Sequence, residues 1–268
     1  MHALSISAAW EQTKAILTRD GGLLAAVALA LIVLPQVLLA VAGVPVGPES
    51  SNLSKLLYVA VVLLGFVAQI ALNRMAIGSA VLVREAIADG FVRLLPVLLV
   101  FCILIVVLVV ATMLLAVVLS VAGLANLQEG GRPTAALVAA LVIITALAFA
   151  IFQLVFPLAA AETGNPIRLI SRSWQLARGQ YLRLLGFVAL IFFGLGVVVI
   201  ASQLGLGSLI VLFLGKPNPG SMSALVLGLI AGLIQAAFTV VTAVMLARIY
   251  VQLAGREEAQ ASVPSSGI

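Results

Sequence analysis

The residues that could do chemistry in this chain are arginines, lysines and tryptophans in a segment that occurs twice. Ile6-Ser7-x-x-Trp10 recurs as Ile170-Ser171-x-x-Trp174, a constant offset of 164 positions between Ile6 and Ile170. Basic residues and a glycine recur at the same offset: Lys14, Arg19 and Gly22 in the first copy, Arg178, Arg183 and Gly186 in the second. Aromatic rings and cations beside a long apolar run are typical of a helix that lies on a membrane surface.

The residues that we assign to this interface combine rings for the acyl boundary with cations for phosphate groups: Trp10, Lys14, Arg19, Arg168, Arg172, Trp174, Arg178, Tyr181 and Arg183. Two roles are open for them. The general one is anchoring, because Trp, Tyr and basic residues mark the cytoplasmic flank of most membrane proteins. The specific one is binding of an anionic lipid headgroup by the four arginines of the second copy. We favour anchoring, with membrane lipids, anionic ones among them, as the partners.

The second copy predicts a short amphipathic helix at residues 166–181. At a helical 100° per residue, one face carries Ile170, Trp174, Ala177 and Tyr181, and the other carries Arg168, Arg172 and Arg183. Asn165 and Pro166 supply an N-cap and a first-turn proline. The first copy predicts a similar helix at residues 3–19, followed by a bend at Asp20-Gly21-Gly22 into the apolar run.

No catalytic constellation is visible in the sequence. The single histidine is His2, which leaves a Ser/His/Asp triad or a His-based zinc site without a base or ligand. There is no phosphate-binding glycine loop and no carboxylate cluster for Mg²⁺. We therefore expect no enzyme activity, no cofactor and no metal. The single cysteine, Cys102, can form no intrachain disulfide. A membrane-embedded lipid enzyme would need polar groups to converge around Glu162, Arg74 and Arg248.

Polar residues within the apolar runs are few, and those that we single out are Gln69, Asn73, Arg74, Gln153, Gln235 and Arg248, with Gln36 and Gln203 as further glutamines. Long spans let Arg74 and Arg248 reach the cytoplasmic interface, and Glu162 could pair with one of them. Glutamines in hydrocarbon usually bond to a neighbouring helix, at about 1 kcal/mol each. We favour that role over a substrate path. Gly228-x-x-x-Gly232 is a small-residue pattern that suggests close helix packing.

The composition requires lipid as the solvent for most side chains. Of the 268 residues, 64% are hydrophobic and 9% charged, against roughly 25% charged in a soluble domain. The net charge of +5 does not indicate a nucleic-acid partner, because the basic residues flank apolar segments. Ala40-Val41-Ala42 imitates a signal-peptidase site, but the apolar run before it is long and the segment at its start recurs internally, so we expect the amino terminus to be retained.

Runs of roughly 20 apolar residues predict six transmembrane helices, which makes an all-α polytopic membrane protein. The predicted spans are 22–43, 56–83, 93–123, 134–161, 182–214 and 223–253, arranged as three hairpins in one membrane domain, 1–254. Kinks are expected at Pro35, Pro96 and Pro157, and a break near Gly205 and Gly207. Residues 84–93 form a weaker third approach segment.

The connections differ in charge from one side of the membrane to the other. The turns that follow the first, third and fifth spans hold only Lys55, Arg132 and Lys216 among the 14 basic residues. The positive-inside rule therefore places both termini in the cytoplasm. Residues 255–268 are predicted to be a disordered cytoplasmic tail.

The segment from Asn165 to Tyr181, with its Ser173-Trp174 pair followed by Leu176, Arg178 and Gly179, resembles a pattern of bacterial six-span inner-membrane proteins. These are the membrane domain named after glycerophosphoryl diester phosphodiesterase and related uncharacterised proteins. Some relatives carry a soluble phosphodiesterase domain after the spans. This chain ends soon after its last predicted span, so that activity is not expected here. The resemblance implies an inner-membrane protein of unassigned role.

These observations favour a non-catalytic inner-membrane protein that acts as a lipid-associated or partner-binding module. The alternative is a small transporter or channel, because duplicated helical hairpins are common in transporters. The two copies start on the same side, so the repeats are parallel. A water-lined cavity bordered by Gln69, Gln153 and Gln235 would favour transport, and a closed centre filled with Leu and Val would favour the scaffold.

Overall fold

Helices account for almost all of the chain that the computed structural model describes, namely residues 5–44, 50–78, 81–121, 135–162, 164–178 and 180–261. In chain order the elements are α1 Ile6–Ala28, the π-helical turn η1 Leu29–Val33, α2 Leu34–Val41, α3 Asn52–Ile77, α4 Val83–Val121, α5 Ala135–Ala161, α6 Pro166–Ala177, α7 Tyr181–Ser202, the π-helical turn η2 Gln203–Gly207, α8 Ser208–Leu214 and α9 Met222–Ala261. The all-α prediction is confirmed for this part of the chain.

Five helical stretches among the described residues are long and apolar enough to cross a membrane: Ile6–Val41, Asn52–Ile77, Val83–Val121, Tyr181–Leu214 and Met222–Gly255. They correspond to the first, second, third, fifth and sixth predicted spans. The fourth predicted span coincides with α5, in which Phe152–Ala161 is a shorter apolar stretch. The structure therefore supports five spans, and the sixth stays a prediction.

Two predicted helix starts are wrong because local hydrogen bonding extends the helices. α3 begins at Asn52, since the Ser51 side chain accepts a hydrogen bond from the Ser54 N–H, and it ends before the extended residue Gly78. The predicted span 56–83 is thus shifted toward the N-terminus. α4 begins at Val83, so the approach segment 84–93 is not separate but forms the first turns of the span.

The predicted tail also begins later than expected. α9 continues to Ala261, so the prediction of disorder is wrong for residues 255–261. Glu257, Glu258 and Ala259 are good helix formers and prolong a helix that is already nucleated. The rest of the predicted tail, 262–268, lies outside the described residues, as does the predicted turn around Arg132.

Both π-helical turns lie at positions where the sequence predicted irregularity. η1 ends two residues before Pro35. The proline ring prevents a normal α-helical hydrogen bond to the carbonyl of the residue four positions earlier. A wider turn absorbs this mismatch. η2 contains Gly205 and Gly207, so the helix widens where a break was expected and continues as α8. Pro96 and Pro157 lie inside α4 and α5.

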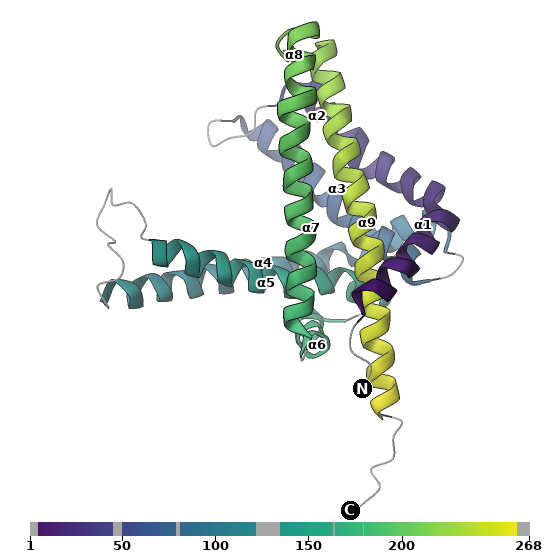
Figure 1. Cartoon of the computed structure of the whole chain (residues 1–268), viewed down its shortest axis with the longest axis vertical. Coiled ribbons are helices and arrows are strands. Elements are labelled where there is room, and N and C mark those ends of the chain that lie inside the picture. Colours follow the sequence, from purple (N-terminus) through teal and green to yellow (C-terminus); the bar gives the residue numbers. More distant parts are fainter. Residues whose placement is uncertain are drawn as a thin grey trace, which may run out of the picture.

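The first helical stretch bends as it follows α9 (Figure 1). Near one end the Thr13 hydroxyl lies 3.5 Å from the sulfur of Met245, and near the other a Cβ on Gly232 would lie 3.2 Å from Val33. Twenty helical residues between Thr13 and Val33 would span about 30 Å if straight, whereas the facing stretch of α9 spans about 20 Å. A bend was predicted at Asp20-Gly21-Gly22, and the stretch does change direction between Thr13 and Val33, while α1 runs unbroken through these three residues.

α9 is the central element of the fold. It packs along α1, η1, α2 and α3, and also contacts α5, α7 and α8. α4 and α5 lie side by side and extend away from the pair formed by α7 and α9 (Figure 1). The buried core lies where these groups meet, around Leu154, Leu158, Leu246 and Ile249.

Candidate functional site

The second copy of the repeated segment forms a separate helix, α6, which is seen almost end-on below α7 and thus lies across its end (Figure 1). Pro166 starts the helix after the extended residue Asn165, whose side chain forms no cap. The helix ends at Ala177 because Arg178 leaves the helical region, with ψ 126°. The sequence predicted that Tyr181 belongs to the apolar face of this helix. That prediction is wrong, because Tyr181 is the first residue of α7.

The bundle-facing side of α6 differs from the predicted apolar face. Leu169, Ser173 and Leu176 are buried, and α6 packs on α4 and α5. Trp174 is 57% exposed on the outer side, together with Arg168 and Arg178. The ring and these two cations are thus all accessible to a lipid surface.

The first copy repeats part of this arrangement, although Gln12 is exposed where its equivalent Leu176 is buried. Ala9 and Thr13 are fully buried, as are Ser173 and Ala177 at the equivalent positions, whereas Trp10 is exposed like Trp174. Its cations have carboxylate partners: the Lys14 amine lies 2.8 Å from Glu11, and the Arg19 guanidinium lies 2.7 Å from Asp20. The first copy therefore offers less unneutralised positive charge than the second.

Two arginines lie at the C-terminal ends of neighbouring helices. Arg93 on α4 donates through Nη1 to the carbonyls of Ala159 and Ala160, at 2.6 and 2.8 Å, in the last turn of α5. Arg248 on α9 donates to the carbonyl of Ala76 in the last turn of α3. These carbonyls have no partner within their own helices, and the helix dipole favours a cation there. The Arg248 side chain was expected from the sequence to reach the cytoplasmic membrane interface, whereas in the structure it binds a backbone carbonyl of α3.

The carboxylates at this end of the molecule have other partners than predicted. Glu162 accepts a hydrogen bond from the Tyr250 hydroxyl at 3.2 Å and lies 4.0 Å from Arg172. The expectation that it pairs with Arg74 or Arg248 is wrong, because Arg74 contacts Asp89 on α4 at 3.2 Å. Arg172 on α6 therefore points toward Glu162 and the bundle. Arg183 on α7 is exposed, and its guanidinium lies 3.4 Å from the Gln180 side chain.

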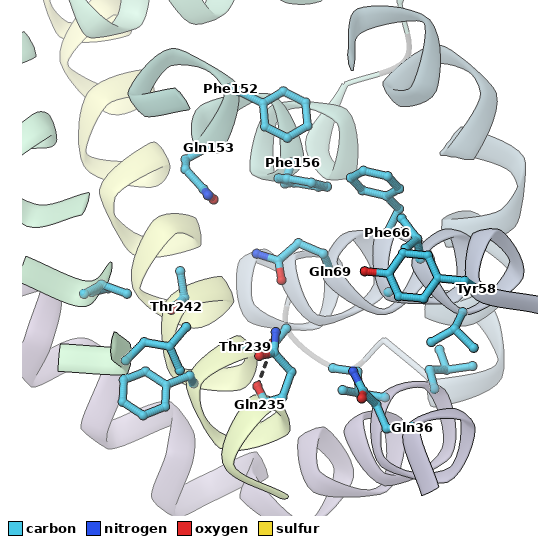
Figure 2. Close-up of a pocket in the computed structure, with 18 of the residues that line it drawn as sticks. Gln36, Tyr58, Phe66, Gln69, Phe152, Gln153, Phe156, Gln235, Thr239 and Thr242 are labelled. Carbon is cyan, nitrogen blue, oxygen red and sulfur yellow. Dashed lines mark hydrogen bonds between the residues drawn. The ribbon is translucent and has the colours of Figure 1, made fainter. Parts of the chain in front are cut away.

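Three predicted polar residues meet in one cavity of about 400 Å³. Gln69 comes from α3, Gln153 from α5 and Gln235 from α9, and Gln36 from α2 joins them. Figure 2 shows the four carboxamides around a common space, with Phe66, Phe152 and Phe156 along one side. Asn73 lies outside the cavity, fully buried, and donates to the Gln69 backbone carbonyl at 2.7 Å.

Residues 4–253 match the protein family described as Domain of unknown function (DUF7847). The chain belongs to the DUF7847 family. The matched region runs from the first repeated segment to α9 and contains Arg93, Arg248, Glu162 and the cavity. No curated protein and no solved structure matches the chain.

Several residues of the DUF7847 domain that shape these sites were not predicted. Tyr58 and Thr242 line the cavity. Asp89 contacts Arg74, and the Tyr250 hydroxyl donates to Glu162. The role of Arg93 could have been predicted from the sequence. Arg93 stands at the start of one predicted span, and the neighbouring antiparallel span ends in Ala159-Ala160-Ala161. The last carbonyls of that helix need a donor, and alanine side chains offer none. For the others, the helix packing had to be known first.

Proposed function

We propose that this DUF7847 protein is a six-span protein of the bacterial inner membrane, with cytoplasmic termini, that acts without catalysis as a lipid-associated module. The observation that carries the proposal is the exposure of Trp174 and Arg168 on α6 and of Arg178 directly after this helix. A ring at the acyl boundary and guanidiniums at phosphate depth are complementary to anionic lipid. The Asn165–Tyr181 motif supports a distant relation to the membrane domain named after glycerophosphoryl diester phosphodiesterase.

Native mass spectrometry of the purified chain in phosphatidylcholine and phosphatidylglycerol mixtures tests the lipid association. We expect the double variant Arg168→Ala/Arg178→Ala to retain less phosphatidylglycerol, by about thirtyfold if each cation contributes near 1 kcal/mol. Arg84→Ala is the matched control, since Arg84 is an exposed arginine on α4, outside this face. Equal phosphatidylglycerol retention by the double variant and the unmodified chain would refute the proposal.

A small transporter or channel is the second candidate, and the cavity lined by Gln69, Gln153 and Gln235 favours it. The lining offers hydrogen bonds without charge, which suits an uncharged polar solute. Swelling of proteoliposomes in glycerol, compared with protein-free liposomes, measures such a flux. Faster swelling supports this candidate, and an unchanged rate argues against it.

A further inference from the structure

The central cavity has the size of a small-molecule binding site, at about 400 Å³. Its wall combines residues of η1, α2 and α3 with residues of α5, α7 and α9, so it lies where the separate helix groups meet. Gly65 is part of this wall, and a Cβ built there would meet no atom within 4 Å. The helices therefore leave open space at this point of the described structure.

Among the described residues that line the cavity, several have hydrogen-bonding groups and none has a charged side chain. Most of it is Leu, Ile, Val and Phe, and the polar groups are Gln36, Gln69, Gln153, Gln235, Tyr58 and two threonines. The Thr239 hydroxyl donates to the Gln235 backbone carbonyl at 2.8 Å and is thereby satisfied (Figure 2). Because no counter-ion is present, a ligand that brought a formal charge into this space would be strongly disfavoured.

The four carboxamides differ in burial: Gln153 is buried, Gln36 and Gln69 are half-buried, and Gln235 is exposed. Within the described part of the chain, none of the hydrogen bonds found involves the side-chain amide of Gln36, Gln69, Gln153 or Gln235. For a buried amide such as that of Gln153, the lack of a partner in an apolar environment costs about 1–3 kcal/mol. Each carboxamide offers both a donor and an acceptor, so a ligand with hydroxyl and carbonyl groups would satisfy them.

We propose that this cavity binds an uncharged lipid whose polar end carries hydroxyl and ester groups, the chemistry of a diacylglycerol. The glutamines hold its hydroxyl and ester oxygens, and Phe66, Phe152 and Phe156 contact the start of its acyl chains. A hydrocarbon tail explains why aromatic and aliphatic side chains form most of the wall. The site is separate from the basic face of α6, so either proposal stands without the other.

Photocrosslinking of the full chain, reconstituted in phosphatidylcholine vesicles with a diazirine-labelled diacylglycerol, tests the site. We expect the label on peptides that line the cavity, around Tyr58–Gln69 and Gln235–Thr242. The double variant Gln69→Leu/Gln153→Leu should lose about tenfold in labelling, as expected for two lost hydrogen bonds. Gln175→Leu is the control, because Gln175 is exposed on α6.

A second variant separates loss of binding from loss of folding. Gly65→Leu places a side chain in the cavity from a position where the Cβ would meet no atom within 4 Å, so thermal unfolding should change little while diacylglycerol labelling of these peptides disappears. Diazirine-labelled phosphatidylglycerol should not label the cavity peptides of the unmodified chain. Labelling of these peptides by both lipids alike, or full diacylglycerol labelling of a folded Gly65→Leu variant, would overturn the proposal.

Discussion

At the scale of single residues, arginines do more internal structural work than their positions in the sequence suggest. Arg93 and Arg248 each donate to carbonyls in the last turn of another helix, and these carbonyls are 66 and 172 positions away in the sequence from the arginines that bind them. Sequence patterns predict on which side of the membrane an arginine lies from the apolar segment that it flanks. They cannot predict such a partner, because every residue type has the same backbone carbonyl.

Replacing Arg93 with Gln should destabilise the packing of α4 on α5. The variant loses charged hydrogen bonds to Ala159 and Ala160 in a half-buried place, and we expect a loss of about 1–2 kcal/mol in unfolding free energy. Thermal unfolding in mild detergent measures it. Arg84→Gln on the same helix is the control, since Arg84 is exposed. Indistinguishable melting of the two variants would show that the carbonyl contacts contribute nothing.

At the scale of elements, the two copies of the repeated segment differ in how they join the next helix. The second copy ends at Ala177, followed by Arg178 and Gly179, whereas the first continues without interruption to Ala28. The position equivalent to Gly179 is Ala15, and alanine is the best helix former where glycine is a poor one. This one difference could have been used to predict a separate α6. We instead predicted a helix at residues 3–19 followed by a bend at Asp20-Gly21-Gly22, whereas α1 is continuous there.

Glycine spacing in α9 was a usable signal for packing. A Cβ on Gly228 would lie 2.6 Å from the Cβ of Ala40, so the Gly228-x-x-x-Gly232 pattern does bring α9 close to α2 and η1. Gly228→Ala should therefore destabilise the chain by about 1–3 kcal/mol through overpacking. Gly194→Ala on α7 adds the same methyl group to open space and should be neutral or stabilising. Thermal unfolding of both variants in detergent measures this difference, and equal stability would contradict the close contact.

At the scale of the whole molecule, apolar run lengths predict most helices well because a bilayer requires a minimum length. The positions of α5, α7 and α8 agree with the predicted spans within a few residues. The sequence could name Gln69, Gln153 and Gln235 as candidates for the border of a cavity, but it could not show that they meet, since this depends on how α3, α5 and α9 pack together. Apolar periodicity shows which residues are lipid-compatible, and not which helices are neighbours.

The side of the membrane on which the connections lie is the central claim of this account, and cysteine accessibility tests it most directly. Cys102 is the single cysteine, so Cys102→Ser gives a clean background for Ser51→Cys, Gly131→Cys, Ser221→Cys and Ser171→Cys. A membrane-impermeant maleimide added to intact cells should label the first three, whereas Ser171→Cys on α6 should react only after lysis. Gly131→Cys tests whether α4 crosses, and Ser171→Cys then decides the sixth span, because residue 171 returns to the cytoplasmic side only if α5 also crosses. Labelling of Ser171→Cys in intact cells, or protection of Gly131→Cys until lysis, would contradict the six-span arrangement.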